Sequence, residues 1–389
     1  MYSIERTGDL PSLLADATVW NRLAAGVPFR ETSWLGPWWQ HFGQDLEAYT
    51  LVARDDRGEL QGILPLYRTH HGPTGRTLAM MGDGQAYSDF VSVIATSPHA
   101  PSVARAMGQF LANVASDTQD GWDVIDIDGI SEGDSAMSAL ARSLSEGGAA
   151  LHSQSRMSSW FRACDASWDD HIKRHGKTQR RKLRKWSKQI ESTDGLQRIV
   201  ADTDEQLTDS VDALIKLHQQ RWTESGEAGS FADAEFESFI RDSAADFYSR
   251  GRLYLPTLTM NDRVVAAELH FIGGDNRLYC YSSGFDTSAS ELEPGRVLHV
   301  DTLMHLYREN LAGIDFLRGD EPYKQRAGAK PTRVLRMRAA APKMLTQLRH
   351  AAWWTGFEVK QWMRKRAGRT PIVVVDMPPV TGTPLSPTE

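Results

Sequence analysis

Short apolar blocks alternate with stretches of helical periodicity along the first half of the chain. The pattern predicts helices at about 11–25, 101–116 and 134–146, and strands at 48–54, 59–68, 90–94 and 122–128. A Trp-rich segment at 34–43 places Trp34, Trp38 and Trp39 at helical spacing, which is more often a core face than a binding platform. Helices that alternate with short strands indicate a mixed α/β sheet.

The second half repeats this alternation after a basic helix. Predicted helices cover 167–192, 204–223, 233–249, 295–311 and 342–367, and predicted strands cover 252–260, 264–272, 277–285 and 313–319. In each half a strand–turn–strand unit precedes a helix and then a short strand with Asp between apolar residues, Ile125-Asp126-Ile127 in one half and Ile314-Asp315-Phe316 in the other. Duplication of one domain is the simplest explanation.

We therefore expect two related α/β domains, at 1–165 and 166–345, with the chemistry in the second. A basic amphipathic helix at 346–369 and a tail at 370–389 would follow them. The tail carries five prolines and no periodic apolar pattern, so we expect it to be unstructured.

The composition is that of an ordinary globular protein, with 41% hydrophobic and 24% charged residues. Cys164 and Cys280 match no metal or redox spacing, which favours a reducing compartment. The first residues lack the apolar region of a signal peptide, and no run approaches 18 apolar residues, so we expect a cytoplasmic protein. His70 and His71, in a predicted turn, lack partners at ligand spacing, and we expect no metal.

The net charge of −6 conceals two basic segments. Nine Lys or Arg and no acid lie at 173–188, and thirteen Lys or Arg with one acid lie at 323–369. Such segments indicate either an anionic ligand or surface, or two solvated helix faces. In the first segment Arg181 is the candidate substrate contact, because like charges crowd it at helical spacing.

The last helix combines aromatic and basic residues. Trp353, Trp354, Phe357, Trp362 and Met363 share it with several Lys and Arg. This mixture is typical of a helix at a membrane interface, although packing against the second domain is the simpler explanation. Peripheral membrane contact therefore stays open at this stage.

The string at 284–326, GFDTSASELEPGRVLHVDTLMHLYRENLAGIDFLRGDEPYKQR, is the most specific pattern. It resembles the end of acetyltransferases of the cellulose-biosynthesis CelD/BcsL type, a GNAT branch related to the Fem peptidyltransferases. The WxxxWWxHFG pattern at 34–43, Ser88-Asp89-Phe90 and HQQRW at 218–222 resemble the same family. The resemblance covers about 30–345 and implies tandem GNAT-like domains and N-acyl transfer, usually from acyl-CoA such as acetyl-CoA.

A GNAT-type site needs backbone donors for a pyrophosphate, an open strand edge, a base and an oxyanion donor. The helix that follows Pro294 suits the first need, because Gly295 lets a ligand approach the backbone and Arg296 adds a fixed charge. The pattern departs from the usual GNAT loop, since only one glycine is present. A simple Pro-Gly helix start explains the same residues.

Glu268 is the first candidate for the base. It lies on the predicted strand 264–272, which carries a catalytic Glu in several GNAT enzymes, and its apolar neighbours should raise its pKa. His270 lies two residues further on the same face and is a candidate substrate contact or base. Either residue could instead be a hydrogen-bonded structural group.

The densest polar cluster follows the strand at 313–319. In the Fem relatives a Lys after a Gly-containing strand end lies at the substrate site, and Lys324 matches it, which implies a role at the acyl oxyanion or a substrate anion. Tyr323 and Tyr281 are candidates for protonating the leaving thiolate. Arg318 and Asp320 are candidate substrate contacts, with a structural salt-bridge network as the alternative.

The sequence thus predicts an N-acyltransferase that uses acyl-CoA and acts on an amine of a sugar, amino acid or cell-envelope precursor for polysaccharide biosynthesis. Glu268, Lys324 and Asp320 should face one cleft. A Fem-like transferase that uses aminoacyl-tRNA and a non-catalytic scaffold of polysaccharide synthesis are the alternatives; other nucleic acids are not expected.

Overall fold

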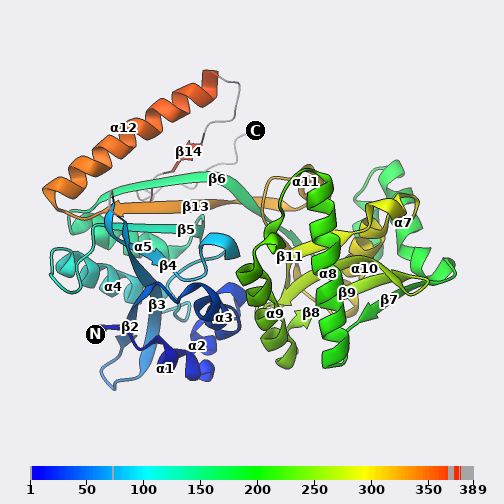
Figure 1. Cartoon of the computed structure of the whole chain (residues 1–389), viewed down its shortest axis with the longest axis horizontal. Helices are drawn as coiled ribbons and strands as arrows, with labels where there is room; N and C mark the ends of the chain where they lie inside the picture. The colour runs from blue at the N-terminus through cyan, green and yellow to red at the C-terminus, as the bar shows by residue number, and fades with distance from the viewer. Residues whose placement is uncertain (1, 72–73, 367–371, 376, 378–389) are drawn as a thin grey trace.

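The computed structural model describes residues 2–71, 74–366, 372–375 and 377. A single twisted sheet runs through the whole molecule, with helices packed on it in both halves (Figure 1). The strands of the first half are β1 (Ser3–Thr7), β2 (Glu47–Arg54), β3 (Leu60–His71), β4 (Gly75–Met80), β5 (Val124–Ser131) and β6 (Ala150–Ala163). Its helices are α1 (Leu10–Ala15), α2 (Ala17–Leu23), α3 (Thr32–Phe42), α4 (Ala100–Val114) and α5 (Ser135–Glu146), with short 3-10 turns η1 (Pro28–Arg30) and η2 (Gly84–Ala86).

The second half follows the same plan. Its strands are β7 (Leu196–Val200), β8 (Leu253–Tyr254), β9 (Pro256–Met260), β10 (Arg263–Ile272), β11 (Arg277–Phe285), β12 (Gly313–Arg318) and β13 (Lys330–Ala340). Its helices are α6 (Trp168–Lys173), α7 (Lys177–Ser192), α8 (Asp204–Glu224), α9 (Ala234–Ser249), α10 (Pro294–Arg308) and α11 (Pro322–Arg326), with η3 (Ser230–Ala232) and η4 (Thr287–Leu292). Helix α12 (Met344–Arg366) and strand β14 (Val373–Val374) end the described chain.

Strand order confirms the predicted duplication. In the first half β1, β2, β3 and β4 pair antiparallel in turn, and β5 pairs parallel to β4. In the second half β7, β9, β10 and β11 do the same, and β12 pairs parallel to β11. The same order and the same directions in both halves are what two copies of one sheet would give.

The halves also exchange a strand. β6 leaves the first half and pairs antiparallel with β12, while β13 returns from the second half and pairs antiparallel with β5. β6 and β13 pair with each other from Ala150–Ala340 to Phe161–Lys330. The division at residue 165 stays a prediction, and the pairing shows that each sheet is completed by a strand of the other half.

An aromatic core joins the two halves. Trp34 of α3 packs edge to face on Phe239 of α9, with ring centroids 4.6 Å apart, and on Phe271 of β10 at 5.4 Å. Trp34 and Trp38 are buried, as expected for a core face, whereas Trp39 is only partly buried. Since residues of both halves bury each other here, we expect the halves to unfold together.

Several predicted elements need correction. Residues 90–94 form no strand, because Phe90 has a φ of 58° and the segment bonds to the sheet only at Val91 and Ile94. The predicted helix 167–192 is broken into α6 and α7 around Gly176. His70 lies in β3 rather than in a turn. Val373 and Val374 pair with β6, so that part of the tail is structured, and 378–389 lie outside the described residues.

Candidate active site

The parallel strands β11 and β12 separate after a short pairing. Their register runs from Arg277–Gly313 to Tyr279–Asp315, although β11 continues to Phe285. Among the described residues, no backbone hydrogen bond joins β11 beyond Tyr279 to β12. We call this gap the second fork. It leaves a strand edge open at the carboxyl ends of parallel strands, where sites collect in α/β sheets.

Glu268 of β10 lies beside the second fork and is buried, with 5% of its surface exposed. Its Oε2 accepts a hydrogen bond from Thr302 Oγ1 at 2.7 Å and lies 3.0 Å from His270 Nε2. Its Oε1 lies 3.3 Å from His299 Nδ1. Since His299 and Thr302 come from α10, this carboxylate ties the helix to the sheet.

The expected rise in the pKa of Glu268 is wrong. Burial alone would raise it, but the neighbouring His299 and the hydrogen bonds from His270 and His299 together hold the pKa well below its usual range. The carboxylate is therefore charged at neutral pH and is engaged by three side chains. A carboxylate held in this way is better suited to orienting a neighbouring histidine than to taking a proton from the substrate itself.

His299 is the residue that the sequence did not single out. With its proton on Nδ1, directed at Glu268, the imidazole keeps a lone pair on Nε2, and this atom is buried and has no hydrogen-bond partner among the described residues. The ring lies against Phe316 and Tyr323, at centroid distances of 5.7 and 6.5 Å. The only signal in the sequence is that His299 and Thr302 share a helix face at i and i+3.

His270 is fully buried and contacts Glu268, so it orients the carboxylate rather than contacting a substrate. Tyr254 lies beside its ring at 5.8 Å and stacks on His305 at 3.8 Å. The predicted substrate role of His270 is thus replaced by a positioning role.

Lys324 of α11 has a different environment from the one expected. Its ammonium donates to the carbonyl oxygens of Leu317, Arg318 and Gly319 at 3.0–3.1 Å and pairs with Glu321 at 2.9 Å. All three N–H groups are therefore used within the chain. In this structure Lys324 fixes the end of β12 and is not free to bind an oxyanion.

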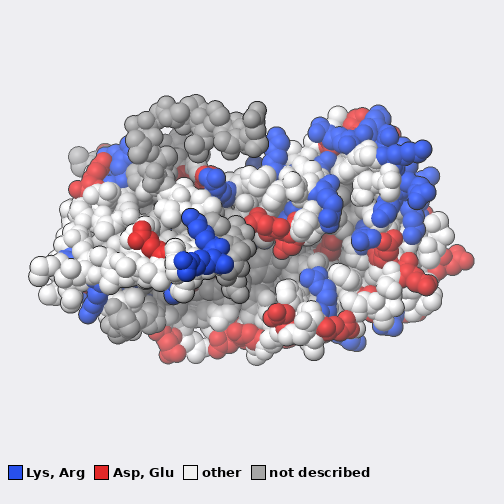
Figure 2. Space-filling view, turned by 90° about the horizontal axis from the view of Figure 1, so that it is seen from above, with Lys and Arg blue, Asp and Glu red and all other residues white. Residues whose placement is uncertain are grey.

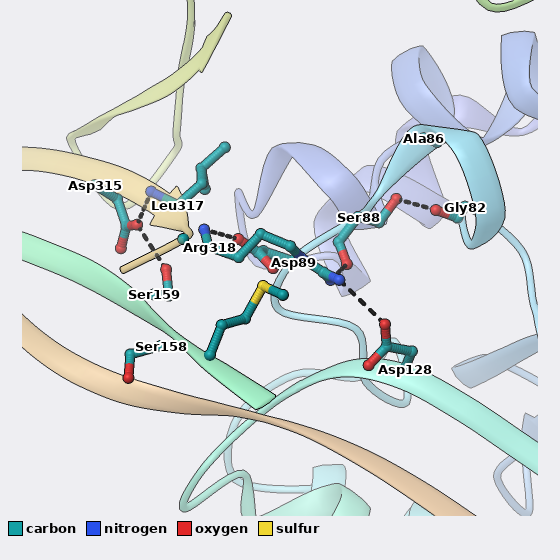
Figure 3. A network of polar contacts seen from close by, with 12 residues as sticks. Gly82, Ala86, Ser88, Asp89, Asp128, Ser158, Ser159, Asp315, Leu317 and Arg318 are labelled. Atoms are coloured by element: carbon teal, nitrogen blue, oxygen red, sulfur yellow. Dashed lines mark hydrogen bonds and ion pairs between the residues drawn. The ribbon is translucent and has the colours of Figure 1, made fainter. Parts of the chain in front are cut away.

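Arg318 contacts the first half rather than an open cleft (Figure 3). Its Nε donates to Asp89 Oδ1 at 2.6 Å, its Nη1 lies 3.1 Å from Asp128 Oδ2, and its Nη2 donates to the Ser88 carbonyl at 2.6 Å. The structural network that was the alternative for Arg318 is what the geometry shows.

Asp320 is exposed and accepts hydrogen bonds from the Ser158 amide and from Trp160 Nε1. These partners belong to β6, so Asp320 lies at the strand exchange and makes no contact with Glu268. The predicted grouping of Glu268, Lys324 and Asp320 in one cleft does not match these contacts.

The two candidate tyrosines differ. Burial raises the pKa of both hydroxyls above the usual range, so only their positions separate them. Tyr281 donates to the Ala86 carbonyl at 3.0 Å and packs on Trp34. Tyr323 is 43% exposed and lies against Phe316 and His299. Of the two, Tyr323 keeps access to the second fork.

Helix α10 begins beside the same fork. A Cβ on Gly295 would lie 3.0 Å from the Phe285 ring, so the glycine permits close packing on β11. Arg296 pairs with Glu293 and lies over the Trp186 ring at 5.5 Å. A carboxylate, Glu293, therefore already faces the helix start, and a pyrophosphate would have to share or displace it. Arg181 is exposed on α7.

Metal chemistry has no geometric support within the described residues, since no three His, Cys, Asp or Glu side chains there are arranged to hold an ion. The fit of an acyl-CoA rests instead on the open edge of β11 and on Tyr323, which is exposed and lies against His299 of α10 and Phe316 of β12. The first turn of α10 fits a phosphate poorly, because Pro294 has no N–H and the Arg296 and Val297 amides donate to the Glu293 carbonyl. The Glu293 carboxylate opposes an anion there as well.

Comparison with protein families places the match in the second half. The family model described as "Acetyltransferase (GNAT) domain" matches residues 177–325. This range contains the second fork, the Glu268–His299 pair and Lys324. No curated protein matches the chain significantly.

Solved structures of similar fold span nearly the whole chain. FemX is 12% identical with a TM-score of 0.59, covering 85% of this chain and 98% of its own. A conserved protein of unknown function from Bacteroides thetaiotaomicron is 13% identical with a TM-score of 0.55, covering 87% of this chain and 100% of its own.

The C-terminal domain of a proposed lysylphosphatidylglycerol synthetase from Agrobacterium fabrum is 11% identical with a TM-score of 0.52, covering 87% of this chain and 94% of its own. At these identities the likeness concerns the fold alone. Together with the repeated strand order, these matches show that the chain has a tandem GNAT fold, as predicted, and that its second half carries the acetyltransferase domain of this fold.

Proposed function

We propose that the chain is an N-acyltransferase that transfers an acyl group from acyl-CoA to an amine of a sugar, amino acid or cell-envelope precursor. The observation that carries the proposal is the contact of buried Glu268 with half-buried His299 beside the open edge of β11, within the segment that matches the acetyltransferase domain. The reaction forms a C–N bond and breaks a C–S bond. The attacking amine loses a proton, and the leaving thiolate gains one.

His299 is assigned as the base in this proposal. Glu268 orients its ring through Nδ1, as a carboxylate orients the histidine of a catalytic triad, and Nε2 receives the proton of the amine. Tyr323 lies against His299 and is the candidate acid for the thiolate. Lys324 remains in the proposal as a positioning residue, because it holds the end of β12 on which Phe316 and Arg318 are placed.

Release of free thiol from acetyl-CoA in the presence of amino sugars, amino acids and polyamines tests this function. We expect the parent protein to release thiol with at least one amine class, and His299→Ala to lower kcat by about 10²–10⁴. His41→Ala is the matched control, because His41 also contacts a carboxylate, Asp242 at 2.7 Å, but lies on α3. Equal turnover in the two variants would remove His299 from the chemistry.

The aminoacyl-tRNA alternative rests on one observation in this chain. Helix α7 carries an exposed basic surface that could bind RNA. Outside the chain, the support is that FemX is among the structural neighbours and that the sequence resembles the Fem peptidyltransferases. RNA binding that weakens steeply with salt, together with no thiol release from acetyl-CoA, would favour this alternative. If the protein neither binds RNA nor releases thiol from acetyl-CoA, the non-catalytic scaffold is favoured.

A further inference from the structure

Helix α12 exposes an apolar face to solvent. Of the thirteen large apolar side chains that are exposed in the described part of the chain, six lie on this helix: Met344 (83%), Leu345 (59%), Leu348 (62%), Val359 (50%), Trp362 (54%) and Met363 (50%). At 100° per residue they fall on one side, together with the exposed Ala351, Ala352, Thr355 and Gly356. We call this side the outer face. A helix on the surface of a water-soluble protein normally packs such residues against the protein interior.

The opposite side of α12 is fixed to the protein. The rings of Trp353, Trp354 and Phe357 surround His152 of β6 at centroid distances of 4.3–5.2 Å. Arg338 of β13 lies over the Trp353 ring at 4.8 Å. Because the helix already packs its other aromatic side on the sheet, docking onto the described part of the chain does not explain the outer face.

Basic side chains flank the outer face. Arg349 and Lys360 follow one border and Lys365 the other, and Arg366 lies over the Trp362 ring at 3.9 Å at the end of the helix. Glu358 is the only acid on α12. Figure 2 looks onto this side of the molecule: a mostly white expanse over α12, broken by one acidic group, ends in a group of Lys and Arg, and a second basic group covers the region of α7.

We propose that α12 lies in the surface of an anionic lipid bilayer, with the outer face among the acyl chains and the basic flanks at the headgroups. The charge pattern favours this occupant over a second copy of the chain, because two outer faces brought together would place like-charged flanks beside each other. None of the described helices has the length and hydrophobicity of a membrane span, so α12 docks along the surface and does not cross it.

Vesicle flotation with the full chain tests this surface. Vesicles of phosphatidylcholine alone are compared with vesicles that contain phosphatidylglycerol, at low and high salt. We expect binding to the anionic vesicles, weakened by salt. Leu348→Gln/Val359→Gln/Trp362→Gln should weaken that binding by about tenfold or more, because each side chain would lose its transfer into lipid.

The matched control is Ile199→Gln/Val200→Gln, which changes two exposed apolar residues on β7 without touching α12. Point variants are preferable to removal of the helix, because removal would expose the ring cluster at His152. Unchanged thermal unfolding of the triple variant keeps the comparison valid, since all three positions are exposed.

Three results would overturn the proposal. One is equal binding of the triple variant and the control. Another is absence of vesicle binding by the parent. The third is a concentration-dependent dimer that the triple variant abolishes while vesicles have no effect, since the occupant would then be a second copy. Weaker binding to anionic vesicles by the triple variant, with binding by the control unchanged, supports docking of α12 on a lipid surface.

Discussion

Each half has a gap between two parallel strands: the first fork lies between β4 and β5, and the second fork lies between β11 and β12. The two gaps have the same topology, but different segments of the chain lie in them. In the first half β4 and β5 pair only at Thr77–Val124 and Leu78–Ile125 before they separate. Residues 88–94 then cross the gap, bonded to β5 through Val91 N and Gly129 O at 2.9 Å and to β3 through the Ile63–Ile94 bridge. In the second half no described residue makes such a crossing between β11 and β12.

Arg318 completes the filling of the first fork. A Cβ on Gly129 would lie 2.2 Å from the Ser88 carbonyl oxygen and 2.9 Å from Arg318 Nη2, so only glycine fits there. Thus the end of β12, in the second half, closes the first fork while its own fork stays open. The two halves thus share one sheet order, whereas the segment after β4 and Arg318 fill the gap between the parallel strands in the first half alone among the described residues.

The largest expected effect follows from breaking that closure. Arg318→Ala removes the partner of Asp89, which is 1% exposed, and leaves its carboxylate buried without a counter-charge. We expect a loss of about 3–5 kcal/mol in the free energy of unfolding. Arg250→Ala, which breaks a more exposed pair with Asp246, should cost at most about 1 kcal/mol. Similar denaturation midpoints for the two variants would contradict a structural role of Arg318.

The next effect concerns the second fork. Glu268→Gln keeps the shape of the side chain but removes the charge that orients His299, so kcat should fall about 10²-fold. Because the lowered pKa means that the ionised carboxylate also stabilises the fold, the thermal midpoint should fall as well. A shift of the kcat–pH profile would separate this role from packing. An unaltered profile with a lowered midpoint would instead make Glu268 a structural residue.

The buried carboxyl of Asp315, on β12, leads us to expect that the stability of the protein depends on pH. Burial raises the pKa of Asp315 to about 7, although Leu317 N and Ser159 Oγ donate to it. Because its folded pKa lies above its unfolded value, the stability that this group contributes is present at acid pH and is lost as pH rises through about 7.

Asp315→Asn should remove that dependence. A tenfold change in proton affinity corresponds to about 1.4 kcal/mol. From pH 5 to pH 8 the free energy of unfolding of the parent should therefore fall by about 2.6 kcal/mol more than that of the variant. Denaturant unfolding at the two pH values measures the difference. Parallel curves for the two proteins would show that Asp315 is already ionised at pH 5.

The smallest effect is expected at α7. Arg180→Gln/Arg181→Gln/Arg184→Gln should lower kcat/KM about 2–10-fold at low salt and flatten its salt dependence, if the exposed basic surface attracts an anionic substrate. Equal efficiency across the salt series would leave α7 a solvated helix, and the substrate need not be anionic.

How far the sequence predicted these features depends on the range of the contacts. The repeated strand–turn–strand and apolar-Asp-apolar units were enough to predict two related sheets, because they are local patterns. The exchange of β6 and β13 was not predictable in this way, since their pairing joins residues about 180 positions apart and neither strand has a distinctive local pattern.

The site shows the same limit. The sequence identified Glu268 by its apolar neighbours in the chain, but burial would raise its pKa, and the strongest influence that lowers it is His299, which approaches from α10. Arg318 was identified as part of a polar cluster, yet its partner Asp89 lies 229 residues away. Local patterns thus indicated chemically important residues and left their roles to be settled by tertiary contacts.

We propose that the second fork, and not the first, receives the acyl donor. Hydrogen exchange of the full chain with and without acetyl-CoA tests it directly, because both forks are followed in one experiment. We predict slower amide exchange in residues 280–297, along the open edge of β11 and the first turn of α10, with residues 79–94 unchanged. Protection of residues 79–94, or no protection in either fork, would contradict the account.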